Sequence, residues 1–192
     1  MNFRRTATAG ILALIVSAAA VPLAGGQTAG AETFSATATV KTAGGATATA
    51  PVTIVVSRKL SQSEADGLAA AFKAGGAAGL RKALAGVPPT GSVRLGNTNP
   101  TESRLTLERP TDKGRLLTIV TDRPILFMGA GLPGAKPKDG YDFAIVDLEV
   151  DAQGNGSGTL SPAATVKLAQ GAFVVDDYAS EIVRLTDVKK VK

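Results

Sequence analysis

The chain has 192 residues and a formal net charge of +5, and it contains no histidine, cysteine or tryptophan. These absences exclude Ser-His-Asp and Cys-His catalytic sites, and also zinc, copper or iron held by His or Cys ligands. Acidic and basic residues alternate along the chain and aromatic residues are few, so we predict no nucleic-acid partner. The chemistry that remains is carboxylate catalysis, metal binding through oxygen ligands, and binding without catalysis.

Residues 1–31 have the pattern of an export leader. Two arginines near the start are followed by a long uncharged stretch, and the tripeptide Ala-Gly-Ala at 29–31 matches the small-x-small site of signal peptidase. We therefore predict cleavage after Ala31, which leaves one exported domain of residues 32–192, periplasmic or extracellular and without a transmembrane anchor. The alternative is an uncleaved anchor, but the apolar run is short for a membrane span and rich in Ala rather than Leu.

A β-hairpin is predicted directly after the leader. Apolar and polar residues alternate over 34–40 and again over 46–57, which is the period of a half-buried strand. The pair Gly44-Gly45 between the two segments is typical of a tight turn. Pro51 predicts that the second strand lies near a sheet edge or a bulge.

A helix is predicted over Gln62–Ala85. The tetrapeptide Ser-Gln-Ser-Glu at 61–64 has the spacing of a capping box, and apolar residues then recur at helical spacing. Gly75-Gly76 predicts a kink, and Gly86 before two prolines predicts the end of the helix.

The second half of the chain is predicted to consist of strands. They lie at 102–108, 115–121 and 124–128, in the hairpin 141–160, and at 166–168, 173–175 and 181–188, the last with a helix as the alternative. Lysines at the very end are expected to serve solubility at a frayed terminus. The predicted fold is therefore α+β: a mostly antiparallel sheet of about eight strands, curled into a barrel-like or sandwich shape, with one Ala/Gly-rich helix inserted after the second strand.

The hairpin 141–160 carries the densest acidic cluster. Asp147, Glu149 and Asp151 alternate with apolar residues and therefore share one face of their strand. They are the residues that a carboxylate-dependent enzyme would use. The alternative is an ordinary solvated strand face, which the alternating pattern favours.

The turn of the same hairpin partly resembles a calcium loop. Asp151, Gln153 and Asn155 have the spacing of oxygen ligands, and Gly156 follows them. Pro162 stands where the bidentate Glu of such a loop is expected, and the flanking segments are predicted strands rather than helices. The alternative is a plain hairpin turn, because Asn-Gly is a strong turn signal. We therefore predict no cofactor, and calcium at this turn is the alternative.

The segment 129–140 is predicted to be a loop that borders a ligand pocket. It matches G-x-G-x-x-G by letters, but Pro133 interrupts the motif and no helix is predicted after it, so a dinucleotide site is not expected. Long loops are nevertheless often functional. The candidate binding residues of this loop are Gly129, Gly131, Gly134, Lys136 and Lys138.

Three functional hypotheses remain open. The leading one is an exported, non-enzymatic protein that binds a small or apolar ligand or a cell-envelope partner, with the mouth of the curled sheet as the binding place. The second is an extracytoplasmic enzyme that uses carboxylates, and the third is a purely structural envelope protein.

Overall fold

The computed structural model describes residues 30–41, 47–125, 141–169, 172–178 and 182–191. These residues form nine strands and one helix. In chain order they are β1 (Glu32–Lys41), β2 (Thr47–Val56), α1 (Gln62–Ala85), β3 (Gly91–Leu95), β4 (Thr101–Thr111), β5 (Gly114–Thr121), β6 (Phe143–Val150), β7 (Gly156–Ala169), β8 (Ala172–Tyr178) and β9 (Val183–Val191).

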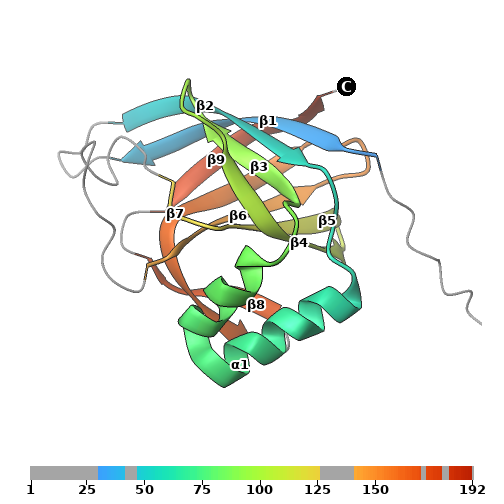
Figure 1. Ribbon diagram of the computed structural model, residues 1–192. Helices are drawn as coiled ribbons and strands as arrows, with labels where there is room; N and C mark the ends of the chain where they lie inside the picture. Colours follow the sequence, from blue (N-terminus) through green and yellow to red (C-terminus); the bar gives the residue numbers. More distant parts are fainter. Residues whose placement is uncertain (1–29, 42–46, 126–140, 170–171, 179–181, 192) are drawn as a thin grey trace, which may run out of the picture.

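Eight of these strands close into an antiparallel barrel (Figure 1). Neighbouring strands follow the order β6-β5-β4-β3-β2-β1-β9-β7, and β7 pairs with β6 to complete the ring. The long strand β7 also pairs with β8, which lies outside the ring. The predicted fold class is confirmed, because the sheet is antiparallel, eight strands curl into a barrel, and the helix follows the second strand.

The barrel interior is filled by side chains. Alternate residues of each strand point inward, and on β1 these are Phe34, Ala36, Ala38 and Val40, all of them buried. Larger residues face them from β5, β6 and β9, among them Ile119. Small alanines on one wall and branched residues on the other pack the centre of an eight-stranded barrel.

A second apolar core lies between the outer wall of the barrel and α1. Phe143 and Ile145 face outward from β6 into this layer, where Leu80 and Leu84 of α1 are buried. Figure 1 shows α1 and β8 together on this side of the barrel. The neighbouring β6 residues at 144 and 146 face the interior core, which explains why this stretch is apolar at every position.

The helix begins and ends as predicted and is kinked. Ser61 caps it: its hydroxyl accepts a hydrogen bond from the Glu64 amide, and the Glu64 carboxylate accepts one from the Ser61 amide. Gly76 has φ +59 and ψ −149, a backbone conformation outside the helical region, and α1 turns there into two limbs (Figure 1). An ion pair of 2.8 Å between Arg81 and Asp142 ties the second limb to the start of β6.

Replacing Ser61 by alanine is expected to lower the free energy of unfolding by about 1 kcal/mol, because the first turn of α1 then loses its side-chain cap. Urea unfolding followed by circular dichroism measures the change. Ser63→Ala is the matched control, since Ser63 is exposed inside the first turn, and it should change stability little. Equal losses in the two variants would contradict the capping role of Ser61.

Two sequence-based expectations about the strands need correction. The lysines near the end of the chain are not all in a frayed tail: Lys189 and Lys190 lie in β9, which pairs with β1. Pro51 does not mark a sheet edge, because β2 pairs with β1 on one side and with β3 on the other. Pro51 is accommodated because the paired stretch of β2 and β3 starts at Val52, the residue after Pro51, so the β2–β3 ladder does not need the N–H that proline lacks. Of the strand predicted at 124–128, the first two residues lie in no strand and the rest is outside the described residues.

Candidate functional site

Five charged side chains meet at one end of the barrel. We call them the barrel-end cluster: Glu32 of β1, Lys59 of the β2–α1 connection, Glu108 of β4, Arg115 of β5 and Lys190 of β9. Glu32 and Arg115 each precede an inward-facing core residue by two positions, so they point to the same inner side of the barrel wall. The cluster therefore lies where the apolar interior ends.

Arg115 joins the two carboxylates of the cluster. Its Nη1 and Nη2 donate to the two oxygens of Glu32 at 3.0 and 2.7 Å, and Nη1 also donates to Glu108 at 2.9 Å. Lys190 donates to Glu32 at 2.7 Å, and Lys59 pairs with Glu108. The Glu32 side chain is only 7% exposed, so its charge depends on these partners rather than on water.

The electrostatics of the cluster favour the ionised forms of Glu32, Glu108 and Arg115. Burial opposes ionisation of Glu32, but hydrogen bonds from Arg115 and Lys190 outweigh it and lower the pKa of Glu32 to about 2. Burial likewise opposes ionisation of Glu108, and the hydrogen bonds from Lys59 and Arg115 hold its pKa below the ordinary value. The hydrogen bond to Glu32 raises the pKa of Arg115 against the effect of burial.

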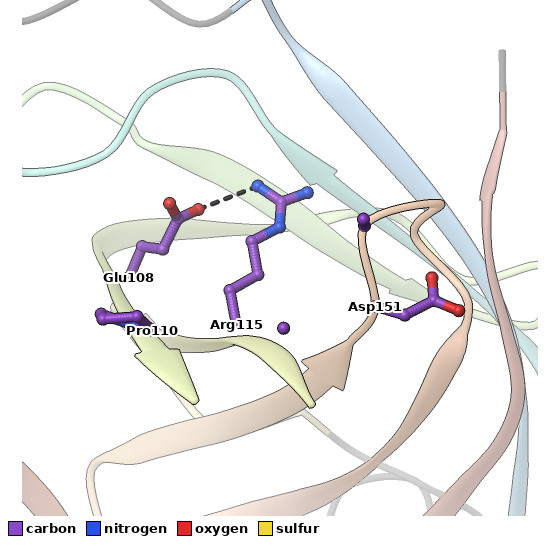
Figure 2. A pocket seen from close by; sticks show the side chains of 6 residues that line it. Glu108, Pro110, Arg115 and Asp151 are labelled. Atoms are coloured by element: carbon purple, nitrogen blue, oxygen red, sulfur yellow. Dashed lines mark hydrogen bonds and ion pairs between the residues drawn. The ribbon is translucent and has the colours of Figure 1, made fainter. Parts of the chain in front are cut away.

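A pocket of about 370 Å³ opens beside this cluster. Glu108 and Pro110 line it from β4, Gly114 and Arg115 from β5, and Asp151 and Ala152 from the β6–β7 turn. Figure 2 shows the ion pair of Glu108 and Arg115 on one side and the turn that carries Asp151 on the other. Gly114 is required here, because a Cβ at this position would lie 2.3 Å from the carbonyl oxygen of Val150.

The β6–β7 turn is held by Asp151. Its Oδ1 accepts hydrogen bonds from the backbone amides of Gln153 and Asn155 at 2.9 and 2.8 Å. The Gly154 carbonyl in turn accepts from the amide of Lys190 at 3.0 Å, which fixes the turn against β9. These bonds give the turn a full structural explanation. Gln153 and Asn155 approach Asp151 through backbone amides, and calcium binding by these three residues stays a prediction.

The other two acidic residues lie on the outer face of β6. Thr118 of β5 donates to Asp147 at 2.6 Å, and Lys113 pairs with Glu149 at 3.4 Å. Burial raises the pKa of Asp147 against the effect of that hydrogen bond. Within the described ranges Asp147, Glu149 and Asp151 have different hydrogen-bond partners, and the enzyme hypothesis built on them stays a prediction. Among the described residues, no group of three or more acidic side chains is arranged to hold a metal ion.

The pocket and the start of β6 lie at opposite ends of the barrel. Strand β5 runs from Gly114 at the pocket to Thr121 at the far end, and β6 starts at that far end. The loop 129–140 lies between these two strands in the chain, and its candidate residues are outside the described residues. The sequence did contain one signal for the pocket end. Glu32 lies two residues before Phe34, so it falls on the same face of the strand as the alternating apolar residues 34, 36, 38 and 40.

The fold and the site define the class of this protein as an eight-stranded antiparallel barrel with a filled interior, an external helix and a charged cluster at one end. Comparison with protein-family models, curated proteins and solved structures finds no match for this chain.

No helix within the described ranges is long and apolar enough to cross a membrane.

Proposed function

We propose that this chain is an exported, non-enzymatic protein that binds a small ligand in the pocket at the β4–β5 end of the barrel. The observation that carries the proposal is the pocket itself, with its volume of about 370 Å³ beside a cluster of fixed charges. Ligand pockets in proteins have volumes of roughly 300–1,000 Å³ and combine apolar walls with a few placed polar groups. Because the barrel centre is filled with side chains, we place the ligand at the mouth, where this pocket lies.

The state of the pocket carboxylates supports binding rather than catalysis. A general acid or base works best when its pKa lies near the working pH. The pKa of Glu108 is instead held below its ordinary value by Lys59 and Arg115. The carboxylate of Asp151 is engaged by the amides of its own turn. Glu108 is therefore suited to fix charge in the pocket, and Asp151 is suited to fix the geometry of its turn.

The start of the barrel supports export. Strand β1 begins at Glu32, directly after the predicted cleavage position. Gly30 and Ala31 are exposed and lie outside the strand, so removal of everything up to Ala31 leaves every residue of β1 in place. A leader can therefore be removed without loss of a barrel contact that β1 makes.

Protein recovered from outside the cytoplasm of its own host is expected to have the mass of residues 32–192 and to carry a noncovalent adduct. Native mass spectrometry measures both properties in one spectrum. The adduct should disappear under denaturing conditions, while the mass of the chain stays the same.

Two controls make this result specific. Ala152→Leu narrows the pocket at an exposed turn position and should yield the same chain mass without the adduct. A chain that keeps residues 1–31 and stays in the cytoplasm would overturn the export proposal. A bare native mass from its own host, together with no binding by any small molecule tested, would overturn the binding proposal.

A further inference from the structure

We propose that the pocket takes a small monocarboxylate, which is bound by the free edge of Arg115 and packs its apolar part against Pro110 and Ala152. This inference rests on the proposed function and names its ligand class. Three features support it: the N–H groups of Arg115 that make no hydrogen bond within the described residues, the charges around the pocket, and the shape of the pocket.

Arg115 keeps one pair of donors free. A guanidinium has five N–H groups, and three of those in Arg115 donate to Glu32 and Glu108. Glu32 accepts one N–H from Nη1 and one from Nη2, at the end of the guanidinium, and Glu108 accepts the second N–H of Nη1. The remaining pair, on Nε and Nη2, makes no hydrogen bond within the described part of the chain. These two N–H groups point in parallel along one side of the plane, which matches the two oxygens of a carboxylate.

The free edge faces the pocket. Glu108 lies on the Nη1 side of the guanidinium, and the side of Nε and Nη2 is turned toward the β6–β7 turn (Figure 2). That turn forms the opposite wall through Asp151 and Ala152. A ligand that enters between the two walls therefore meets the free donors without displacing Glu32 or Glu108.

The charges around the pocket limit the ligand to one anionic group. The barrel-end cluster contains three cations and two carboxylates, and Asp151 on the pocket wall adds a third carboxylate, so cluster and wall together are neutral. The paired donors of Arg115 attract one ligand carboxylate locally, whereas a second anionic group, as in a dicarboxylate or phosphate, would be repelled by Asp151 and Glu108.

The walls favour a short apolar group on the ligand. Pro110, Gly114 and Ala152 present carbon atoms to the pocket, and its volume of about 370 Å³ is near the lower end of the range for ligand sites. A short acyl or aryl chain fits such a space, whereas a long lipid chain would need the barrel interior, which is filled.

Calorimetric titration of the purified full chain with hexanoate at pH 7 tests the proposal. We expect hexanoate to bind, and hexanamide, succinate and inorganic phosphate to bind at least tenfold more weakly. Arg115→Lys should weaken hexanoate binding roughly tenfold or more, because a lysine lacks the paired donors. Arg94→Lys is the matched control, since Arg94 is exposed on β3 and contacts Thr53, and it should bind hexanoate like the parent chain.

A second variant separates loss of the site from loss of the fold. Ala152→Leu removes no charge and lies in an exposed turn, so it should keep the parent unfolding transition and lose hexanoate binding. Equal binding of hexanamide and hexanoate would overturn the monocarboxylate inference while leaving the proposed binding function intact. Binding that survives both Arg115→Lys and Ala152→Leu would overturn the assignment of this pocket.

Discussion

Glutamine in place of Glu32 is expected to lower the free energy of unfolding by about 3 kcal/mol at pH 7. The substitution leaves Arg115 and Lys190 beside a neutral group in a place where the parent carboxylate is 7% exposed, and breaking a buried ion pair on one side costs about 3–5 kcal/mol. We expect the lower end of this range of cost, because the Lys190 side chain is 41% exposed and water can solvate its charge. Urea unfolding at low ionic strength measures the difference.

Glu149→Gln is the matched control for this substitution. Glu149 also belongs to an ion pair, with Lys113, but that lysine is 79% exposed, and such surface pairs contribute only about 0–1 kcal/mol. If Glu32→Gln is no more destabilising than Glu149→Gln, the barrel-end cluster does not stabilise the fold.

The same carboxylate predicts how stability changes in acid. The pKa of Glu32 is about 2 in the folded chain, below its ordinary value of 4.5, so the unfolded chain takes up this proton first as the pH falls. The contribution of Glu32 is therefore complete above pH 4.5 and is lost as the pH falls toward 2. Across that range the stability difference between the parent and Glu32→Gln should shrink, and a constant difference would contradict the assigned pKa.

Alanine in place of Phe34 is expected to be the most destabilising single change, at about 4 kcal/mol. The Phe34 ring is fully buried in the barrel interior, and truncation of such a ring leaves a cavity that an eight-stranded wall cannot collapse to fill. Urea unfolding again measures the loss. Ile182→Ala is the control, because Ile182 is 38% exposed and its truncation should cost well under about 1 kcal/mol. Similar losses in the two variants would contradict the packed interior.

Local features of the fold could be predicted from the sequence. The helix was bounded correctly because the capping box at Ser61 and the glycine after Ala85 act through neighbouring residues. The hairpin around Asp151 was found for the same reason. Closure of the barrel was harder to predict from the sequence, because it depends on pairing between β1 and β9, which lie at opposite ends of the described chain. The lysines of β9 were consequently misread as a frayed tail.

The candidate site was not predicted for a related reason. Its ion pairs join residues that are 83 positions apart for Glu32 and Arg115 and 158 positions apart for Glu32 and Lys190. No short sequence pattern records such partners. The acidic cluster at Asp147 attracted attention because its members are neighbours in sequence, yet the described pocket recruits only Asp151 from that group.

The pairing of β1 with β9 also sets the order in which the molecule can fold. A chain that emerges from its amino end presents β1 first, and its partner on one side arrives only with the last strand. Until then the inner face of β1, with Phe34 on it, has no closed core, and the edge of the strand is open to pairing with other chains. Non-local pairing of this kind is slow. Ring closure therefore waits for β9, which is compatible with the export before folding that we propose.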